Sequence, residues 1–264
     1  MLEIAKKIEG GEKVALVTIT QVNGSSPGKN GSIMAVFLDG TTMGTVGGGE
    51  LEYQIISSAK DALRLGENKN FDLKLTSNEK LDMRCGGSIK GYIKVFKNRK
   101  KLIVVGGGHL GIELYKLGKF LGFYTVVIDD REEFANKERF EDADELLTGN
   151  IPDILENYDF GDESYVVIVT RGHLQDEEAL KSVINNNLPY IGMIGSRKKV
   201  TETYEHLKNK GVNREELLKI FSPIGLDIST GEPNEIAFGI MAEILKVKNN
   251  GSGNHMKDVK KIKI

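Results

Sequence analysis

Three glycines at dinucleotide-binding spacing lie directly after a short apolar stretch of the chain. Gly106, Gly108 and Gly111 follow the apolar residues at 102–105 and precede leucines that recur at helical spacing. In this pattern the first glycine permits a tight turn, the second lets the backbone approach a pyrophosphate, and the third lets helix and strand pack closely. The first turn of the helix, which includes His109, offers free N–H groups and a positive dipole to an anion. These residues predict a site for the phosphates of a nucleotide.

A second apolar strand, expected at 125–129, ends in two acidic residues. Asp129 or Asp130 lies about 20 residues beyond the glycines, where a carboxylate can accept hydrogen bonds from ribose hydroxyls. An acid at this point favours unphosphorylated ribose, so NAD is expected before NADP.

Polar residues also follow two later strands, and ligands of open α/β sheets bind beyond the carboxyl ends of the strands. His173 follows the strand expected at 165–170 and is a candidate general acid or base, a ligand contact or a structural histidine. Ser196 and Arg197 follow the strand expected at 190–194 and open a helix, which suits a second phosphate.

Two turns in the amino-terminal half bring backbone amides and hydroxyls close together. They contain the pair Ser25 and Ser26 and the run Gly47, Gly48 and Gly49. One glycine would be enough to begin the helix expected at 50–65, so a run of three indicates close approach of the backbone to a phosphate or carboxylate. Ordinary turns would use the same residue types.

Cys85 is the single cysteine of the chain and follows Arg84, whose positive charge favours the reactive thiolate. Alternatively, Cys85 is a small hydrophobic side chain buried in the core. A single cysteine excludes an internal disulfide and a zinc site built from several cysteines.

The overall composition argues against a nucleic-acid-binding or membrane protein. Lys and Arg number 36 against 38 Asp and Glu, so no strong field attracts nucleic acid or a membrane surface. An apolar stretch of about 20 residues would be needed to cross a bilayer, and the sequence has none. The amino end does not have a signal-peptide pattern, so a cytoplasmic protein is expected.

The basic stretch at 97–101 marks the expected boundary between two domains. An α+β domain is expected at 1–99, a Rossmann-like domain with a doubly wound parallel sheet at 100–248, and a flexible polar tail at 249–264. In the first domain, strands are expected at 14–20, 32–37, 42–46, 71–75 and 91–96. In the second, strands are expected at 102–105, 125–129, 145–147, 165–170 and 190–194, and helices at 109–121, 152–158, 176–186, 198–210, 213–220 and 233–246.

Seven segments of the chain resemble the XdhC/CoxI family of accessory factors, which serve the maturation of xanthine dehydrogenase and carbon monoxide dehydrogenase. They are GSSP at 24–27, GTVGGGELE at 44–52, CGG at 85–87, VVGGGHLG at 104–111, DDREEFAN at 129–136, YIGMIGSRKK at 190–199 and SPIGLDI at 222–228. The segments occur in the family's order and span roughly residues 10–247, so only the tail is outside the resemblance.

The resemblance implies a chaperone of the molybdenum cofactor, in its molybdopterin or its cytosine dinucleotide form. Such a protein shields the cofactor, assists its sulfuration with a cysteine desulfurase and delivers it to a molybdenum hydroxylase apoenzyme; a homodimer is also implied. On this basis a nucleotide-like moiety is held by Gly106, Gly108, Gly111 and Asp129, and a phosphate by Ser196 and Arg197. The pterin would be faced by Gly47, Gly48, Gly49, Ser25 and Ser26.

Two cysteine positions matter for the resemblance. Cys85 would approach molybdenum or carry sulfur. Many relatives have another cysteine directly after the glycine run, where this chain has Glu50, so a molybdenum contact by that thiol is excluded here.

Two other classes of function are compatible with the nucleotide-binding pattern. One is an NAD-dependent oxidoreductase, with His173 as proton donor and Arg171 orienting a substrate. The other is a nucleotide-sensing regulatory protein without chemistry of its own.

Overall fold

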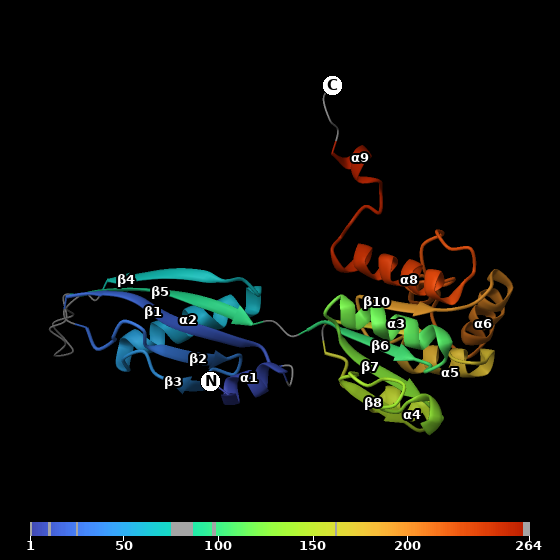
Figure 1. The fold of residues 1–264 in the computed structure, drawn as a ribbon, viewed down its shortest axis with the longest axis horizontal. Helices are drawn as coiled ribbons and strands as arrows, with labels where there is room; N and C mark the ends of the chain where they lie inside the picture. The colour runs from blue at the N-terminus through green and yellow to red at the C-terminus, as the bar shows by residue number, and fades with distance from the viewer. Residues whose placement is uncertain are drawn as a thin grey trace. The chain divides into compact units, whose positions relative to one another are not determined.

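The protein consists of two compact units, Met1–Asn98 and Arg99–Ile264, in a computed structural model (Figure 1). It describes residues 2–9, 12–24, 26–74, 87–96, 99–161 and 163–260. Within these ranges, none of the helices combines the length and the apolar character needed to span a membrane.

The amino-terminal unit is an antiparallel sheet with a long helix against one face. Its elements are α1 (Leu2–Glu9), β1 (Val14–Asn23), β2 (Ile33–Phe37), β3 (Thr42–Gly44), α2 (Gly49–Leu65), β4 (Lys69–Lys74) and β5 (Ser88–Phe96). The strands lie in the order β3-β2-β1-β5-β4. Leu51, Ile55 and Ala59 recur at helical spacing and are buried, so this face of α2 packs on the sheet (Figure 1).

The carboxy-terminal unit alternates strands and helices along the chain. Its elements are β6 (Lys101–Val105), α3 (His109–Phe120), β7 (Tyr124–Asp129), a 3₁₀ turn (Glu132–Phe134), β8 (Glu145–Thr148), α4 (Ile151–Asn157), β9 (Ser164–Ile168), α5 (His173–Val183), β10 (Tyr190–Met193), α6 (Arg197–Asn209), α7 (Arg214–Leu217), α8 (Pro233–Lys248) and α9 (Met256–Val259). All strand pairs of its sheet are parallel, in the order β10-β9-β6-β7-β8.

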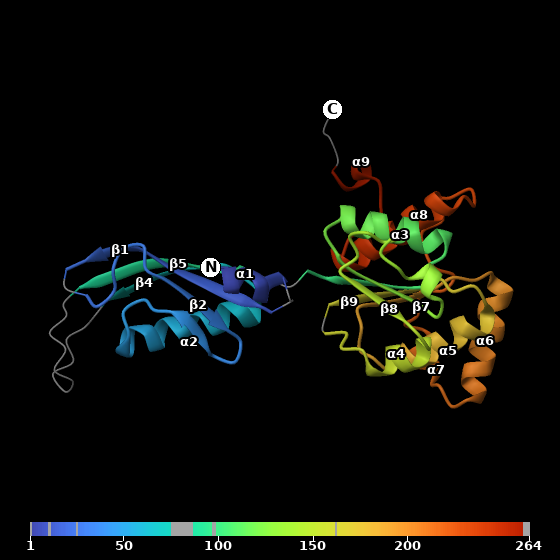
Figure 2. The ribbon, with the colours of Figure 1, turned by 60° about the horizontal axis from the view of Figure 1, so that its bottom comes forward.

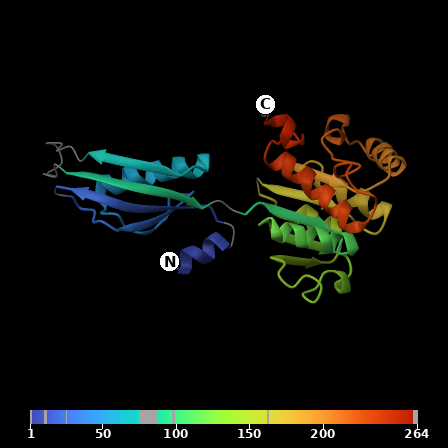
Figure 3. The same cartoon turned by 45° about the horizontal axis from the view of Figure 1, so that its top comes forward.

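Helices cover both faces of the parallel sheet, so its strands are apolar on both sides. Leu102 and Val104 of β6 pack toward α3 and α8, whereas Ile103 and Val105 pack toward α4, α5, α6 and α7. Figure 2 shows these two layers of helices, and Figure 3 shows α3 and α8 side by side over one face. The predicted fold class, a Rossmann-like unit after an α+β unit, is confirmed.

The order of the strands reverses next to β6. The chain runs from β6 to β7 and β8 on one side, and then places β9 and β10 on the other. Val105 pairs with Ile128 of β7 and Ile168 of β9, so the three strands end at the same level. The glycines that follow Val105 therefore lie at the switch point of the sheet, where ligands of such folds bind.

Several local predictions differ from the structure, among them the absence of α1 from the predicted elements and the end of β1, which runs to Asn23. The helix expected from residue 176 begins at His173, because Gly172 adopts the extended N-cap conformation. The helix expected at 213–220 is confined to α7, since the chain leaves it to place Phe221 beside β10, with a bond from Phe221 N–H to the Ile191 carbonyl. The tail contains the short helix α9, in which Met256 and Val259 are exposed.

Candidate functional site

A pocket of about 240 Å³ opens at the carboxyl edge of the parallel sheet. Its lining comes from the segments that follow four strands: Gly106, Gly108, His109, Leu110, Asp129, Arg131, Val169, Thr170, Arg171 and Ile194. The structure thus brings together five of the residues named from sequence: Gly106, Gly108, His109, Asp129 and, from the oxidoreductase alternative, Arg171. The pocket lies at the switch point, which makes it the candidate site for a nucleotide or phosphate.

The tight turn after β6 depends on the absence of side chains. Gly106 has a φ of +121°, and a Cβ there would lie 2.4 Å from the Val169 carbonyl oxygen. A Cβ on Gly111 would lie 2.0 Å from the Gly106 carbonyl oxygen. Gly111 therefore serves the packing of α3 against the turn, as the glycine pattern predicts.

Gly108 has a different role, because it is the N-cap of α3. Among the described residues, no atom lies within 4 Å of where its Cβ would stand. Glycine supplies no side-chain acceptor to the amides of the first turn, and that turn carries no acidic residue. The positive end of α3 is thus open toward the pocket, and exposed His109 lies beside it. These features fit a phosphate group.

Asp129 is 2% exposed, and its carboxylate is hydrogen-bonded within the protein. It accepts hydrogen bonds from Gly107 N–H at 2.8 Å and from Arg131 N, Nε and Nη2 at 3.1, 2.9 and 3.1 Å. Burial acts to raise the pKa of Asp129, but the bonds from Arg131 and Gly107 outweigh it and hold the pKa below its ordinary value. A carboxylate has about four acceptor positions, so ribose hydroxyls would have to displace Arg131 to reach it.

The loop after β9 is fixed by a buried carboxylate. Asp176 of α5 accepts hydrogen bonds from Thr170 N–H at 3.0 Å and Thr170 Oγ1 at 2.6 Å. Burial raises the pKa of Asp176 despite these two bonds. Thr170 lines the pocket, so Asp176 sets the position of one of its walls.

Three further candidates lie outside the lining of this pocket. His173 is exposed in the first turn of α5. Ser196 is the N-cap of α6 and accepts a bond from Lys199 N–H at 3.4 Å, and Arg197 begins that helix with an exposed side chain. Their assigned roles remain predictions.

The turn at the triple glycine of the amino-terminal unit binds a carboxylate of the same unit. Glu52, in the first turns of α2, accepts bonds from Val46 N–H at 3.0 Å, Gly48 N–H at 3.1 Å and the Thr45 hydroxyl. The bond from Thr45, ahead of those from the backbone amides, lowers the pKa of Glu52 despite the opposing effect of burial. The carboxylate of Glu52 thus lies where the sequence predicted a ligand phosphate or carboxylate.

The two predicted turns of this unit lie next to each other. Gly47 has a φ of +133°, and a Cβ on it would lie 2.7 Å from Gly28 N. Ser26 Oγ accepts a bond from the same Gly28 N–H at 3.2 Å. Glu50 is exposed and accepts a bond from Gln54 at 3.1 Å. Ser25 and Cys85 lie outside the described residues, and their roles remain predictions.

We expect Glu52→Gln to destabilise the amino-terminal unit by about 1 kcal/mol, as for loss of a helix cap. The pKa of Glu52 is lowered on folding, so its stabilisation is present above the ordinary pKa of 4.5 and is lost as pH falls through the folded value. Urea unfolding at about pH 7 and about pH 3 measures both effects, and the difference from wild type should shrink at the lower pH. Glu50→Gln is the matched control; an equal loss there would contradict the capping role.

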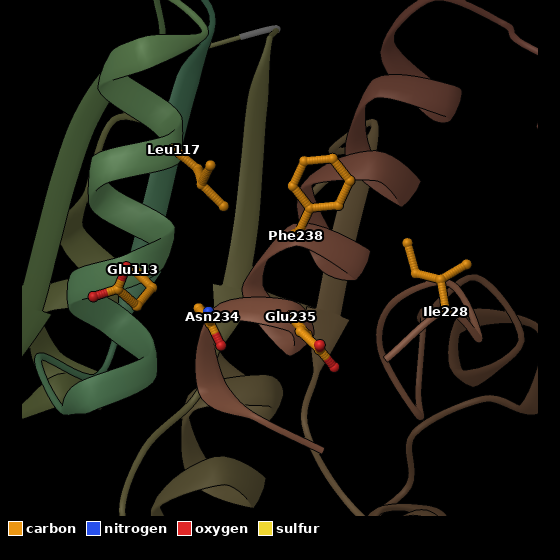
Figure 4. Close-up of a pocket in the computed structure, with 6 residues that line it drawn as sticks. All are labelled: Glu113, Leu117, Ile228, Asn234, Glu235 and Phe238. Atoms are coloured by element: carbon orange, nitrogen blue, oxygen red, sulfur yellow. The ribbon is translucent and has the colours of Figure 1, made fainter. Parts of the chain in front are cut away.

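A second, larger hollow of about 420 Å³ lies between α3 and α8 (Figure 4). Leu117 and Phe238 face it, with Glu113 and Glu235 at one end. Its described lining holds carboxylates and an amide but no cation, so it does not suit a phosphate. The described residues also contain no cluster of three or more His, Cys, Asp or Glu side chains suited to a metal ion.

Comparison with known proteins places these two units in one family. Residues 102–244 match the XdhC Rossmann domain, and residues 8–74 match the XdhC and CoxI family. The chain belongs to the XdhC/CoxI family. The pocket of this XdhC/CoxI-family protein lies within the matched Rossmann domain, and the turn at Gly47 lies within the other matched segment.

Two curated relatives extend the comparison. The chain is 32% identical over 257 residues to the uncharacterized protein YqeB of Escherichia coli, covering 96% of this chain and 47% of that protein. It is 28% identical over 157 residues to a Bacillus subtilis protein named as a probable xanthine dehydrogenase subunit, covering 60% of this chain and 46% of that protein. The chain therefore spans about half the length of these relatives.

A solved structure supports the fold. The crystal structure of a protein described as a xanthine dehydrogenase from Bacillus halodurans superposes with a TM-score of 0.54 at 22% identity. The match covers 94% of this chain and 96% of that one, so the likeness extends over both units.

Proposed function

We propose that this XdhC/CoxI-family protein is an accessory factor for a xanthine dehydrogenase-type molybdenum hydroxylase. It binds the molybdenum cofactor as cargo, protects it and delivers it to the apoenzyme. The family membership supports this role, as do the names of one curated relative and of the similar solved structure. The observation that carries the proposal is the open amino end of α3 in a pocket at the switch point of the sheet.

The pocket supplies what a phosphate-bearing cargo needs. The cofactor carries a phosphate or, in its cytosine dinucleotide form, a pyrophosphate, which the amides after Gly108 would bind. Arg131 and Arg171 add positive charge to the lining. Once delivered, the cofactor supplies the molybdenum centre at which the client enzyme reacts. Sulfuration with a cysteine desulfurase, a role of Cys85 in it, and a homodimeric state are further parts of this proposal.

NAD binding is the second candidate, and it is favoured by Asp129 at the end of β7. It would make the protein an NAD-dependent oxidoreductase or a nucleotide sensor. The bonds from Arg131 to Asp129 weaken this alternative, because a ribose would have to replace them.

The delivery role is tested by measuring transfer of the cofactor from this protein to an apoenzyme. The protein is loaded anaerobically with the cofactor and mixed with a xanthine dehydrogenase-type apoenzyme, and the recovery of hydroxylase activity is followed. We expect faster and more complete activation than with the same concentration of free cofactor, because the bound cofactor is protected. Equal activation by free cofactor would refute the delivery role.

A further inference from the structure

A charged bridge joins the segments that follow β7 and β9. Asp130 accepts hydrogen bonds on Oδ2 from Arg171 Nη2 at 3.2 Å and from Gln175 Nε2 at 2.8 Å. Its other oxygen lies 3.6 Å from Arg131 Nε. The Asp130 carboxylate thus contacts Arg131 of its own loop, Arg171 of the loop after β9 and Gln175 in the first turn of α5.

The order of the strands places this bridge over the glycine turn. β6 lies between β7 and β9 in the sheet, so a contact between the loops after β7 and β9 crosses the end of β6. The turn from Gly106 to Gly108 and the open amino end of α3 lie at that end. A phosphate bound there would come close to the bridge.

Arg171 is the member of the bridge best able to change partner. Its side chain is 56% exposed, whereas that of Arg131 is 22% exposed and is bonded to buried Asp129. The Arg131 guanidinium also lies 3.5 Å from the centre of the Phe134 ring. Asp130 would keep Gln175 and Arg131 as neighbours after Arg171 had left, so the exchange leaves no isolated charge.

We propose that Arg171 is the exchangeable phosphate-binding cation of this pocket and that Asp130 competes with the phosphate for it. In the free protein Asp130 holds Arg171, and a bound phosphate or pyrophosphate replaces Asp130 as its partner. This inference rests on the proposed function, because it concerns the ligand of the same pocket. The exchange makes the pocket selective for an anion with enough charge to replace Asp130 as the partner of Arg171. A neutral nucleoside cannot replace Asp130, so Arg171 adds nothing to its affinity.

The test is titration calorimetry of the full chain with cytidine 5′-diphosphate, and with cytidine as the uncharged comparison. We expect Asp130→Asn to bind the diphosphate about two- to fivefold more tightly, the range for release of a partly exposed ion pair. Arg171→Gln should bind it about tenfold more weakly, as for loss of a charge-assisted bond. In the Arg171→Gln background, Asp130→Asn should give no gain in affinity, because Asp130 there has no Arg171 for which to compete with the phosphate.

Asp61→Asn is the matched control for the change in net charge. It frees Arg64, whose Nη1 lies 3.2 Å from Asp61 on the surface of α2 in the other unit, and it should leave the affinity unchanged. Unchanged or weaker binding by Asp130→Asn would overturn the inference, as would a gain that persists in the double variant. Thermal unfolding of each variant confirms that it is folded.

A Gly108→Asp variant separates this inference from the proposed function. If Gly108→Asp abolishes diphosphate binding while Asp130→Asn has no effect, the pocket binds phosphate and only the exchange fails. If Gly108→Asp changes nothing, the phosphate site itself is wrong. Absence of binding by both the wild type and Asp130→Asn would refute both.

Discussion

Gly108→Asp should make the protein more stable and unable to bind its ligand. Gly108 is an N-cap with φ −69° and ψ −168°, a conformation that aspartate adopts readily at this position. The new carboxylate would cap α3 and stabilise the unit by about 0.5–1 kcal/mol. It would also place a negative charge where the phosphate binds, and we expect an affinity loss of about 100-fold or more. Calorimetric thermal unfolding and ligand titration measure the two effects.

Gly108→Asn is the control for shape without charge. Asparagine caps a helix about as well as aspartate but adds no negative charge at the positive end of the dipole, so the gain in stability should be smaller, about a few tenths of a kcal/mol. The loss of affinity should be clearly smaller, because the like-charge repulsion is absent. Equal affinities of Gly108→Asp and wild type would show that no phosphate binds at the amino end of α3.

Gly111→Ala should destabilise the carboxy-terminal unit, although alanine is the better helix former by about 1 kcal/mol. The added Cβ would lie 2.0 Å from the Gly106 carbonyl oxygen, which forces the helix away from the turn. We expect a net loss of about 2–3 kcal/mol, typical of overpacking against backbone. Scanning calorimetry of the full chain should show the transition of this unit about 4–12 °C lower.

Gly172→Ala provides the matched control for that change. Gly172 is the N-cap of α5, has an extended backbone conformation, and has no described atom within 4 Å of where a Cβ would stand. Its replacement should cost about 1 kcal/mol or less. A loss as large as that of Gly111→Ala would show that close packing is not what requires glycine at 111.

The fold follows from patterns that are local in the sequence. The apolar runs at Ile103 and Val126 predict strands buried on both faces, and the glycines after the first run place a turn and a helix. Because parallel strands end at a common edge, the same patterns also predict that Gly106, Gly108 and Asp129 lie near one pocket.

The partners of the charged residues could not be predicted in the same way. Arg131 follows Asp129 by two residues, and this spacing is the one sequence signal for their pairing, yet whether the side chain turns back is set by the loop and by Phe134. Asp130 and Arg171 are 41 residues apart in the sequence. They meet because β7 and β9, the strands that they follow, lie on either side of β6 in the sheet. The sequence pattern identifies Glu52 only as an acid near the start of a helix, and its bonds to the glycine turn depend on three-dimensional geometry.

The central claim is that the pocket after β6 binds the phosphate end of the molybdenum cofactor. The most direct measurement is anaerobic titration of the wild type and Gly108→Asp with the cofactor and, separately, with NADH. We predict near-stoichiometric cofactor binding by the wild type, loss of that binding in Gly108→Asp, and weak or no binding of NADH. Tight NADH binding without cofactor binding would contradict the account and assign the pocket to a dehydrogenase or a nucleotide sensor.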